Sequence, residues 1–325
     1  MSTLYLDRKG LELRVDGAAL ALYELGRRCR TIPLALLDRV VIRSEVSLSS
    51  TVLGALGNAG CAAVILSGRQ SRLLAIVHGR AHNDGLLRLT QYARVQDTAW
   101  RLRWAKRFVQ GKVLRQERVL SRALAARPDC SKPIFDALQS LRSLRARLTD
   151  DLLSIESLRG MEGAAQAAYF RAFAALFPES LGFNGRNRRP PRDPVNGSLS
   201  LAYTLLHFEA VRTAYAAGLD PFLGFFHEIA FGRESLACDL IEPIRPLADR
   251  WVWEMFRSRV LRSEHFHWDK GACLLGKAGR ARFYEQFEEF LRAAARRLRG
   301  YCRLLVGNLR ASAAELPAAD GEEDL

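Results

Sequence analysis

Residues 86–126 read LLRLTQYARVQDTAWRLRWAKRFVQGKVLRQERVLSRALAA, and this stretch decides the predicted fold. Apolar residues recur along it at helical spacing, and it contains few helix-breaking residues. Its basic residues alternate with the apolar ones; they include Arg94, Arg101, Arg103, Lys106, Arg107, Lys112 and Arg115. A basic helix face is usually solvated surface, but so many cations with so few acids are also typical of a face that contacts phosphates. Both interpretations stay open.

The sequence before this stretch predicts β-structure instead. Short apolar runs between residues 3 and 78 are separated by turn residues such as Asp16-Gly17. Only residues 49–60, with a serine at the start and a glycine at the end, predict a short helix. We therefore expect an α+β protein, divided into a β-rich domain at 1–78, a linker at 79–85, an α-helical domain at 86–310 and an acidic, disordered tail at 311–325.

Further helices are expected in the second half of the chain. Asp193-Pro194 and Asp220-Pro221 each place an aspartate at an N-cap and a proline at the first helical position. The first of these helices should end at Gly218 and the second near Gly232. The other predicted helices cover about 133–151, 152–177, a segment from 235 onward, and 278–310.

The composition indicates a polyanionic partner. Lys and Arg number 49 against 35 Asp and Glu, which gives a net charge of +14. A GC-rich genome would explain the preference for arginine over lysine but not the excess of positive charge. Neutralised phosphates release counterions, so a nucleic acid is the partner that this excess favours.

Targeting and redox signals point to the cytoplasm. Asp7 lies within the N-terminal segment, which lacks an apolar core, so no signal peptide is predicted. No apolar run approaches the ~18 residues of a membrane-spanning helix. The six cysteines include no C-x-x-C pair, so free thiols are expected rather than a zinc ribbon.

Two candidate site residues lie in apolar helical surroundings. Glu162, in LRGMEGAA, is flanked by Gly160 and Gly163. Glycine inside a helix costs about 1 kcal/mol relative to alanine, so the pair indicates a close approach of another backbone or a functional role. His227 follows the apolar run FLGFF. Taken alone, Glu162 is more simply a surface acid and His227 a hydrogen-bonded core residue.

A third candidate segment is SLACDLIEP, where Asp239 and Glu242 are three residues apart. On a helix both carboxylates point to one side, and their apolar neighbours suggest that this side is shielded from water. Salt bridges to Arg233 and Arg245 are the simpler interpretation. If the three segments meet, their oxygens and imidazole nitrogen suit Mg²⁺ or Mn²⁺. Spacing alone does not show that they meet.

Several sequence segments carry a family resemblance. In chain order they are LRGMEGAAQAAYF, RNRRPPRDPVNGSLSLAYTLL, GLDPFLGFFH and GRESLACDLIEPIRPLADRWV. Together they resemble the CRISPR-associated integrase family of spacer acquisition (the Cas-one family). Weaker similarities extend over most of the chain; they involve His78-Gly79, Asn83, Arg88, Gln91, Lys106, Gly111, Lys112 and Gln116.

The resemblance implies a small N-terminal β-sandwich-like domain followed by a larger all-α catalytic domain. It also implies that Glu162, His227 and Glu242 are metal ligands and that Asp239 assists the site. The arginines of the loop before Asp193, together with one at the last motif, are candidate DNA contacts; these are Arg186, Arg188, Arg189, Arg192 and Arg245. A solvated basic loop, or pairing of Arg245 with the acids, is the alternative.

The implied activity is DNA strand transfer. A homodimer bridged by a small ferredoxin-like partner protein would capture a short DNA duplex, and each site would join a 3′-hydroxyl to a phosphodiester at the leader–repeat boundary. Endonuclease activity is the hydrolytic form of this transesterification. A transposon-linked or repair nuclease, and an inactive DNA-binding scaffold, are the alternatives.

Overall fold

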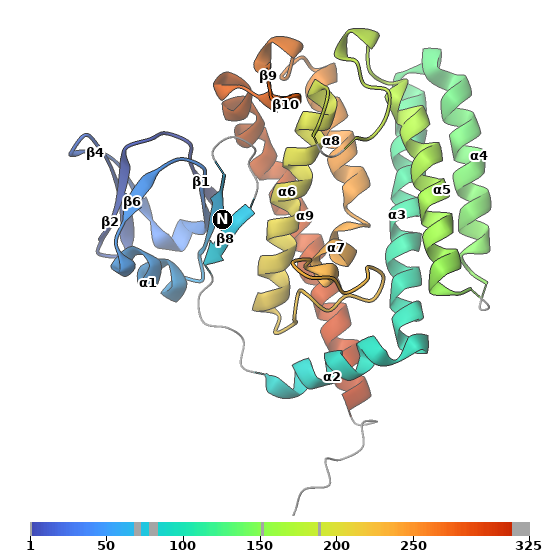
Figure 1. Cartoon of the computed structure of the whole chain (residues 1–325), viewed down its shortest axis with the longest axis horizontal. Helices are drawn as coiled ribbons and strands as arrows, with labels where there is room; N and C mark the ends of the chain where they lie inside the picture. The colour runs from blue at the N-terminus through green and yellow to red at the C-terminus, as the bar shows by residue number, and fades with distance from the viewer. Residues whose placement is uncertain (1, 68–72, 78–83, 151–152, 188–189, 314–325) are drawn as a thin grey trace, which may run out of the picture. The chain divides into compact units, whose positions relative to one another are not determined.

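The computed structural model describes residues 2–67, 73–77, 84–150, 153–187 and 190–313. A β-rich N-terminal part is followed by a mostly helical remainder (Figure 1), which confirms the α+β prediction. Two compact units pack internally: the first comprises residues 1–81, 177–208 and 251–293, and the second 82–176, 209–250 and 294–325. The domain boundaries expected from the sequence stay a prediction.

Two four-stranded sheets form the N-terminal part. The first has the order β1-β5-β7-β8 and consists of β1 (Ser2–Leu6), β5 (Leu37–Ile42), β7 (Ala62–Leu66) and β8 (Leu73–Val77). The second has the order β4-β3-β2-β6 and consists of β4 (Arg27–Pro33), β3 (Ala19–Glu24), β2 (Leu11–Asp16) and β6 (Val46–Leu48). Strand β2 pairs antiparallel with β3 through a tight turn, where Gly17 has a φ of +57°.

A single hydrophobic core joins these sheets. Along β2, Leu11 and Leu13 are buried while the alternate Glu12 and Arg14 are more exposed, as period-2 patterning requires. Helix α1 (Ser50–Asn58) confirms the short helix predicted in this part of the chain. Side chains from both sheets and α1 form the core; they include Leu6, Leu13, Leu20, Val40, Val52 and Leu56.

The first unit also contains parts of three long helices and a β-hairpin that the sequence did not predict. The helices are α6 (Pro194–Ala216), α8 (Arg245–Arg257) and α9 (Lys277–Ala313), and the hairpin consists of β9 (Phe266–Asp269) and β10 (Ala272–Leu275). The side chain of Asp193 accepts a hydrogen bond from the backbone N–H of Asn196 at 2.8 Å, which confirms the predicted start of α6. Four short 3₁₀ segments cover Leu34–Leu36, Pro128–Cys130, Glu179–Leu181 and Ser263–His265.

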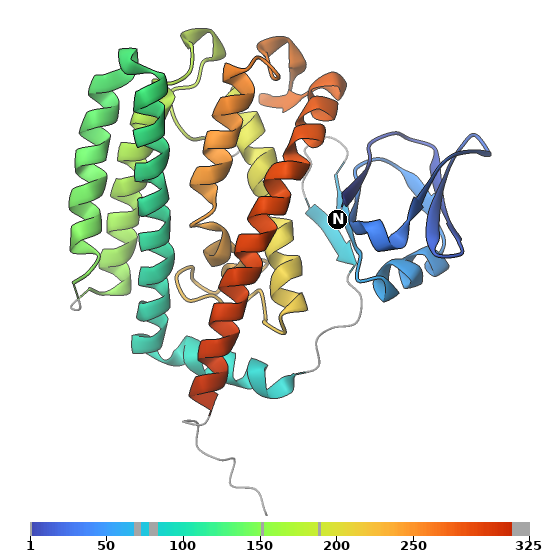
Figure 2. The ribbon, with the colours of Figure 1, turned by 180° about the vertical axis from the view of Figure 1, so that it is seen from behind.

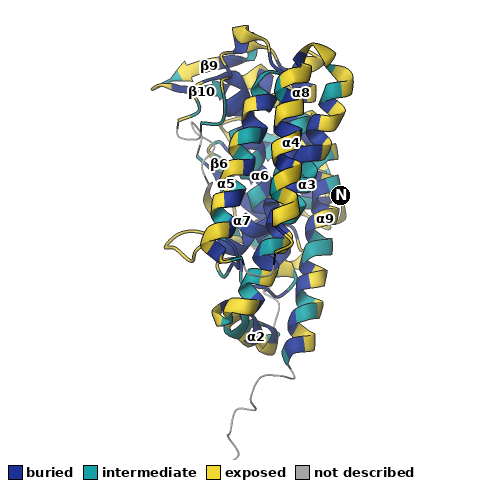
Figure 3. Ribbon diagram, turned by 90° about the vertical axis from the view of Figure 1, so that its right-hand side faces the viewer, coloured by how far each residue is buried: buried dark blue, intermediate teal, exposed yellow. Residues whose placement is uncertain are grey.

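The second unit is built on a helical bundle. Helices α3 (Thr98–Ala126), α4 (Ser131–Arg147) and α5 (Ile155–Ala174) lie side by side (Figures 1 and 2), preceded by α2 (Gly85–Gln96). The stretch 86–126 is divided because Asp97 ends α2 and caps α3, accepting from the N–H of Trp100 at 3.0 Å. Helix α4 buries one face and exposes the other (Figure 3), the pattern of a surface helix on a bundle.

The helix predicted from Asp220 to Gly232 is wrong, because these residues form an irregular loop. Several of its backbone groups bond to side chains of other segments, beside a local bond from the N–H of Leu223 to the carbonyl of Asp220 at 3.4 Å. The N–H of Asp220 donates to Gln91 at 2.8 Å, and the N–H of Phe225 donates to Asp239 at 2.6 Å. The loop is followed by the short helix α7 (Ser235–Ile241). Within the described ranges, none of the helices combines the length and apolarity needed to cross a membrane.

Candidate active site

The loop before α7 is shaped around the buried carboxylate of Asp239. This carboxylate accepts hydrogen bonds from the backbone N–H groups of Phe225 at 2.6 Å, Phe226 at 3.0 Å and His227 at 2.9 Å. A Cβ on Gly224 would lie 2.7 Å from the Asp239 Oδ2 atom and 2.7 Å from the backbone at the start of α7. Only glycine therefore fits where the loop crosses α7.

Three polar side chains from the helices hold the same loop. Gln91, fully buried on α2, donates to the carbonyl of Asp220 at 2.9 Å. Arg101 on α3 and Arg159 on α5 donate to the carbonyls of the two phenylalanines that precede His227, each at 3.0 Å. Because side chains from α2, α3 and α5 all bond to it, the loop presents His227 from a defined position.

The imidazole of His227 lies between the two acids of α7. Its Nδ1 is 2.7 Å from Oδ1 of Asp239, and its Nε2 is 3.8 Å from Oε1 of Glu242. Asp239 accepts hydrogen bonds, so in the neutral imidazole the proton lies on Nδ1 and Nε2 carries the lone pair. The second nitrogen is therefore the one able to bind an electrophile or a metal ion.

The ammonium of Lys112 lies between the carboxylates of Glu162 and Glu242. It is hydrogen-bonded to Glu162 on α5 and lies 2.6 Å from Oε2 of Glu242. The Lys112 side chain is 3% exposed. Immediately before it, a Cβ on Gly111 would lie only 3.2 Å from Pro243, so α3 passes very close to the end of α7. This close packing brings the lysine against the acids.

The electrostatics of the cluster keep Glu242 ionised. Burial alone would raise the pKa of Glu242, but the positive charges of Arg245 and Lys112 outweigh it and lower the pKa from 4.5 to about 2. The Arg245 Nε lies 3.2 Å from the Glu242 carboxylate. This contact agrees with the simpler interpretation, in which Arg245 forms a salt bridge with the acids.

All four acid and imidazole residues singled out in the sequence meet here: Glu162, His227, Asp239 and Glu242. Sequence analysis missed the roles of Lys112, Arg101 and Gln91. The two cations were assigned to a basic face, although Lys112 is buried and Arg101 bonds to the loop. The Gly111-Lys112 pair was the available signal, because a small residue beside a lysine permits the close helix approach that buries it.

The glycines around Glu162 do not play the predicted packing role. A Cβ on Gly160 or Gly163 would meet nothing within 4 Å, so no backbone among the described residues approaches there. Around the site, the close approaches are at Gly111 and Gly224. The Glu162 side chain itself is 20% exposed.

The predicted DNA-contacting arginines are only partly described. Arg186 donates to Asn196 at 2.7 Å and to Ser200 at 3.1 Å, and its guanidinium lies over the ring of Tyr203. These bonds order the loop before α6. Arg188 and Arg189 lie outside the described residues.

The donor types match those of a divalent metal site. Two carboxylates and the Nε2 nitrogen of His227 are ligand types that suit Mn²⁺ or Mg²⁺, and Asp239 accepts the usual hydrogen bond from the other imidazole nitrogen. As the described side chains stand, no three His, Cys, Asp or Glu residues are grouped closely enough to hold a metal. A cation nevertheless already joins two of the donors, because the Lys112 ammonium contacts both Glu162 and Glu242.

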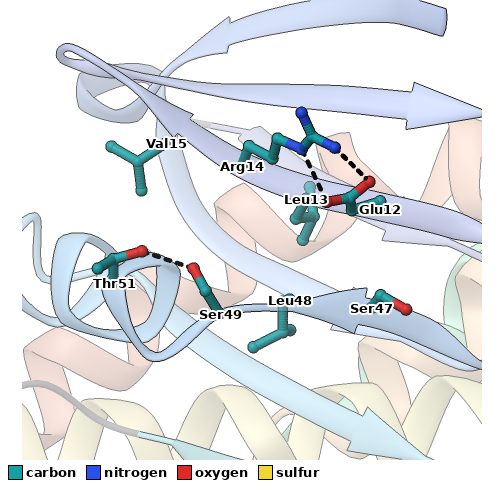
Figure 4. Close-up of a pocket in the computed structure, with 8 residues that line it drawn as sticks. All are labelled: Glu12, Leu13, Arg14, Val15, Ser47, Leu48, Ser49 and Thr51. Atoms are coloured by element: carbon teal, nitrogen blue, oxygen red, sulfur yellow. Dashed lines mark hydrogen bonds and ion pairs between the residues drawn. The ribbon is translucent and has the colours of Figure 1, made fainter. Parts of the chain in front are cut away.

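A separate hollow lies in the β-rich part (Figure 4). It measures about 510 Å³ and is bordered by β2, β6 and the start of α1. Its charged groups, Glu12 and Arg14, are paired with each other at 2.7 Å, and Ser49 bonds to Thr51 at 2.5 Å. With its charges paired and no imidazole or thiol among its lining residues, this hollow does not offer the chemistry of the helical site.

Together these features define an α+β protein whose second unit carries a cluster of carboxylates, an imidazole and a buried lysine. A sequence profile of the family described as "CRISPR associated protein Cas1" matches residues 4–289, and the chain belongs to this family. A CRISPR-associated endonuclease Cas1 of Thermodesulfovibrio yellowstonii is 40% identical over 293 residues, which cover 90% of this chain and 92% of the relative.

Solved structures share the fold. The chain resembles a Cas1 protein from Thermotoga maritima with a TM-score of 0.81 and 22% identity, over 99% of this chain and 100% of the other. It also resembles a casposase bound to its integration product, with a TM-score of 0.80 and 23% identity, over 95% and 91% of the two chains.

Proposed function

We propose that this protein is a divalent-metal-dependent DNA integrase and endonuclease that inserts new spacers into a CRISPR array. Membership of the Cas1 family supports this function, as does the name endonuclease carried by a relative of nearly equal length and 40% identity. The fold is also that of a casposase solved with an integration product. The observation that carries the proposal is the meeting of Glu162, His227 and Glu242 in one cluster.

Glu162, His227 and Glu242 would hold Mg²⁺ or Mn²⁺ in this function. When bound, a divalent ion stabilises negative charge that develops on a phosphodiester and favours the ionised form of an attacking hydroxyl. Asp239 keeps the proton on Nδ1 of His227, and Arg245 keeps Glu242 ionised. The bonds from Gln91, Arg101 and Arg159 hold the histidine loop in place, which serves a reaction that depends on positioning.

The substrates and partners follow from the same function. Double-stranded DNA is favoured by the net charge of +14, and it would serve as both the captured prespacer and the repeat target. A homodimer with a small ferredoxin-like adaptation partner would hold two sites on one duplex. One solved complex of similar fold, with a TM-score of 0.79, contains Cas1 together with Cas2.

A strand-transfer assay tests this function. A short duplex with free 3′-hydroxyl ends is incubated with the protein and a leader–repeat DNA in Mn²⁺, in Mg²⁺ or in EDTA. We expect joined products in at least one of the metals and none in EDTA. An unrelated target duplex of equal length reports selectivity for the repeat. Joining that persists in EDTA would contradict metal dependence, and the absence of joining and cleavage under all conditions, including with the partner protein added, would contradict the enzyme.

A further inference from the structure

Lys112 lies on the basic stretch of α3, but its side chain is buried in the site rather than exposed on the surface. Lys112 is 3% exposed, and its ammonium contacts two carboxylates from different helical segments. A buried ammonium is retained only when anionic or hydrogen-bonding partners offset its loss of hydration. Glu162 and Glu242 are those partners.

The same two carboxylates are the proposed oxygen ligands of the metal. Oε2 of Glu242 lies 2.6 Å from the ammonium, and the other oxygen of that carboxylate lies 3.2 Å from the Arg245 Nε. A metal ion that takes oxygens from both Glu162 and Glu242 therefore needs the position that Lys112 now fills. Two cations also repel each other strongly at such short range in a poorly hydrated site.

We propose that Lys112 is the built-in counter-ion of this site, and that a divalent metal binds by displacing its ammonium from Glu162 and Glu242. The inference rests on the metal site of the proposed function. The lysine stabilises the metal-free protein, because without it two carboxylates would share one buried region. It also weakens metal binding, because every metal ion must first break its contacts.

Metal titration of the full-length protein tests this role. Free Mn²⁺ is measured by electron paramagnetic resonance for wild type and for Lys112→Met, which keeps the length of the side chain without its charge. The matched control is Lys106→Met on the same helix, since Lys106 bonds to the carbonyl of Asp150 and not to the acids of the site. We expect Lys112→Met to bind Mn²⁺ at least about tenfold more tightly than wild type, because a competing charge is removed. Lys106→Met should stay within about twofold of wild type.

Thermal unfolding gives an independent readout. In EDTA, Lys112→Met should unfold at a lower temperature than wild type, and saturating Mn²⁺ should raise its midpoint by more than it raises that of wild type. Should Lys112→Met not fold in EDTA, it should fold in Mn²⁺, with Lys112→Gln as a second variant of the same kind.

The outcomes separate this inference from the function on which it rests. A folded Lys112→Met that binds Mn²⁺ as wild type does, or more weakly, overturns the counter-ion role while wild-type binding leaves the metal site intact. Failure of both Lys112 variants to fold in saturating Mn²⁺ also overturns it, because the metal should then replace the lost charge. No Mn²⁺ binding by wild type or either variant contradicts the metal site itself.

Discussion

The carboxylate of Asp239 has two structural roles, and both concern His227. Its oxygens accept the backbone N–H groups of Phe225, Phe226 and His227, and one of them also accepts from the imidazole of His227. The acid thus folds the loop and orients its histidine at once. Its carboxylate is fully buried, so in the proposed reaction it would act through His227 rather than by touching DNA.

Replacing Asp239 by asparagine should therefore weaken metal binding as well as stability. We expect Mn²⁺ affinity to fall by about 10- to 100-fold, the usual effect of losing the partner of a ligating histidine. The free energy of unfolding should fall by about 1–3 kcal/mol, because an amide nitrogen would face backbone N–H groups. Isothermal titration and denaturant unfolding measure the two effects.

Asp193→Asn provides the control for this prediction. Asp193 is also a buried aspartate that accepts backbone and side-chain N–H groups, but it caps α6. That variant should lose stability and keep its Mn²⁺ affinity. If both variants kept the wild-type affinity for Mn²⁺, Asp239 would be structural only.

Glycines of a helix and of the histidine loop differ in how closely other segments approach them. Gly163 on α5 has open space where a Cβ would be, whereas a Cβ on Gly224 would lie 2.7 Å from atoms of α7. Gly163→Ala should raise the free energy of unfolding by up to about 1 kcal/mol through helix propensity. Gly224→Ala should lower it by about 1–3 kcal/mol through overpacking. Denaturant unfolding of both variants checks the contrast, and a destabilised Gly163→Ala would show that α5 is packed there.

Much of the fold is predictable from local patterns. Period-2 alternation identifies β2, the Asp193-Pro194 pair identifies the start of α6, and the long helical period identifies α3 and α5. The helix prediction for 220–232 failed because the Asp-Pro signal is local, whereas the bonds from Gln91 and Asp239 come from other segments. A local sequence pattern does not show that side chains elsewhere will compete for the backbone N–H groups of a segment.

Some residues of the site could likewise be predicted from the sequence, and others could not. The acids and the histidine could be selected from the sequence for two reasons. Their residue types are those that bind metals, and they lie in segments that occur in the order of a known family. Lys112 was not selected, because a lysine on a basic stretch looks solvated unless the small residue beside it, Gly111, is taken as a sign of close packing. Its burial depends on the approach of α3 to Pro243 at Gly111, a tertiary contact.

At the scale of the whole molecule, the net charge of +14 is more informative than any single basic face. Several cations of α3 are used inside the protein, since Lys112 binds acids, Arg101 holds the histidine loop and Arg115 bonds to Tyr301 at 2.9 Å. Because Lys112 is buried, neither interpretation of the basic face, solvated surface or phosphate contact, applies to it. The net excess of positive charge over the whole chain still favours a polyanionic partner.

DNA binding should accordingly depend steeply on salt. We expect the affinity for a short duplex to fall at least about a hundredfold between about 50 and 200 mM salt, as several phosphate contacts require. Fluorescence anisotropy in EDTA measures this binding without turnover. A salt-independent affinity would contradict DNA recognition through phosphates.

The central claim is that Glu162 and His227 belong to one catalytic site, and strand transfer by Glu162→Ala and His227→Ala tests it most directly. Glu156→Ala, an exposed glutamate on the same helix α5, is the control. Joining of a 3′-hydroxyl duplex to repeat DNA in Mn²⁺ is measured beside duplex affinity. We predict that both site variants lose joining and retain duplex binding, while Glu156→Ala joins as wild type does. Undiminished joining by either site variant would contradict the account.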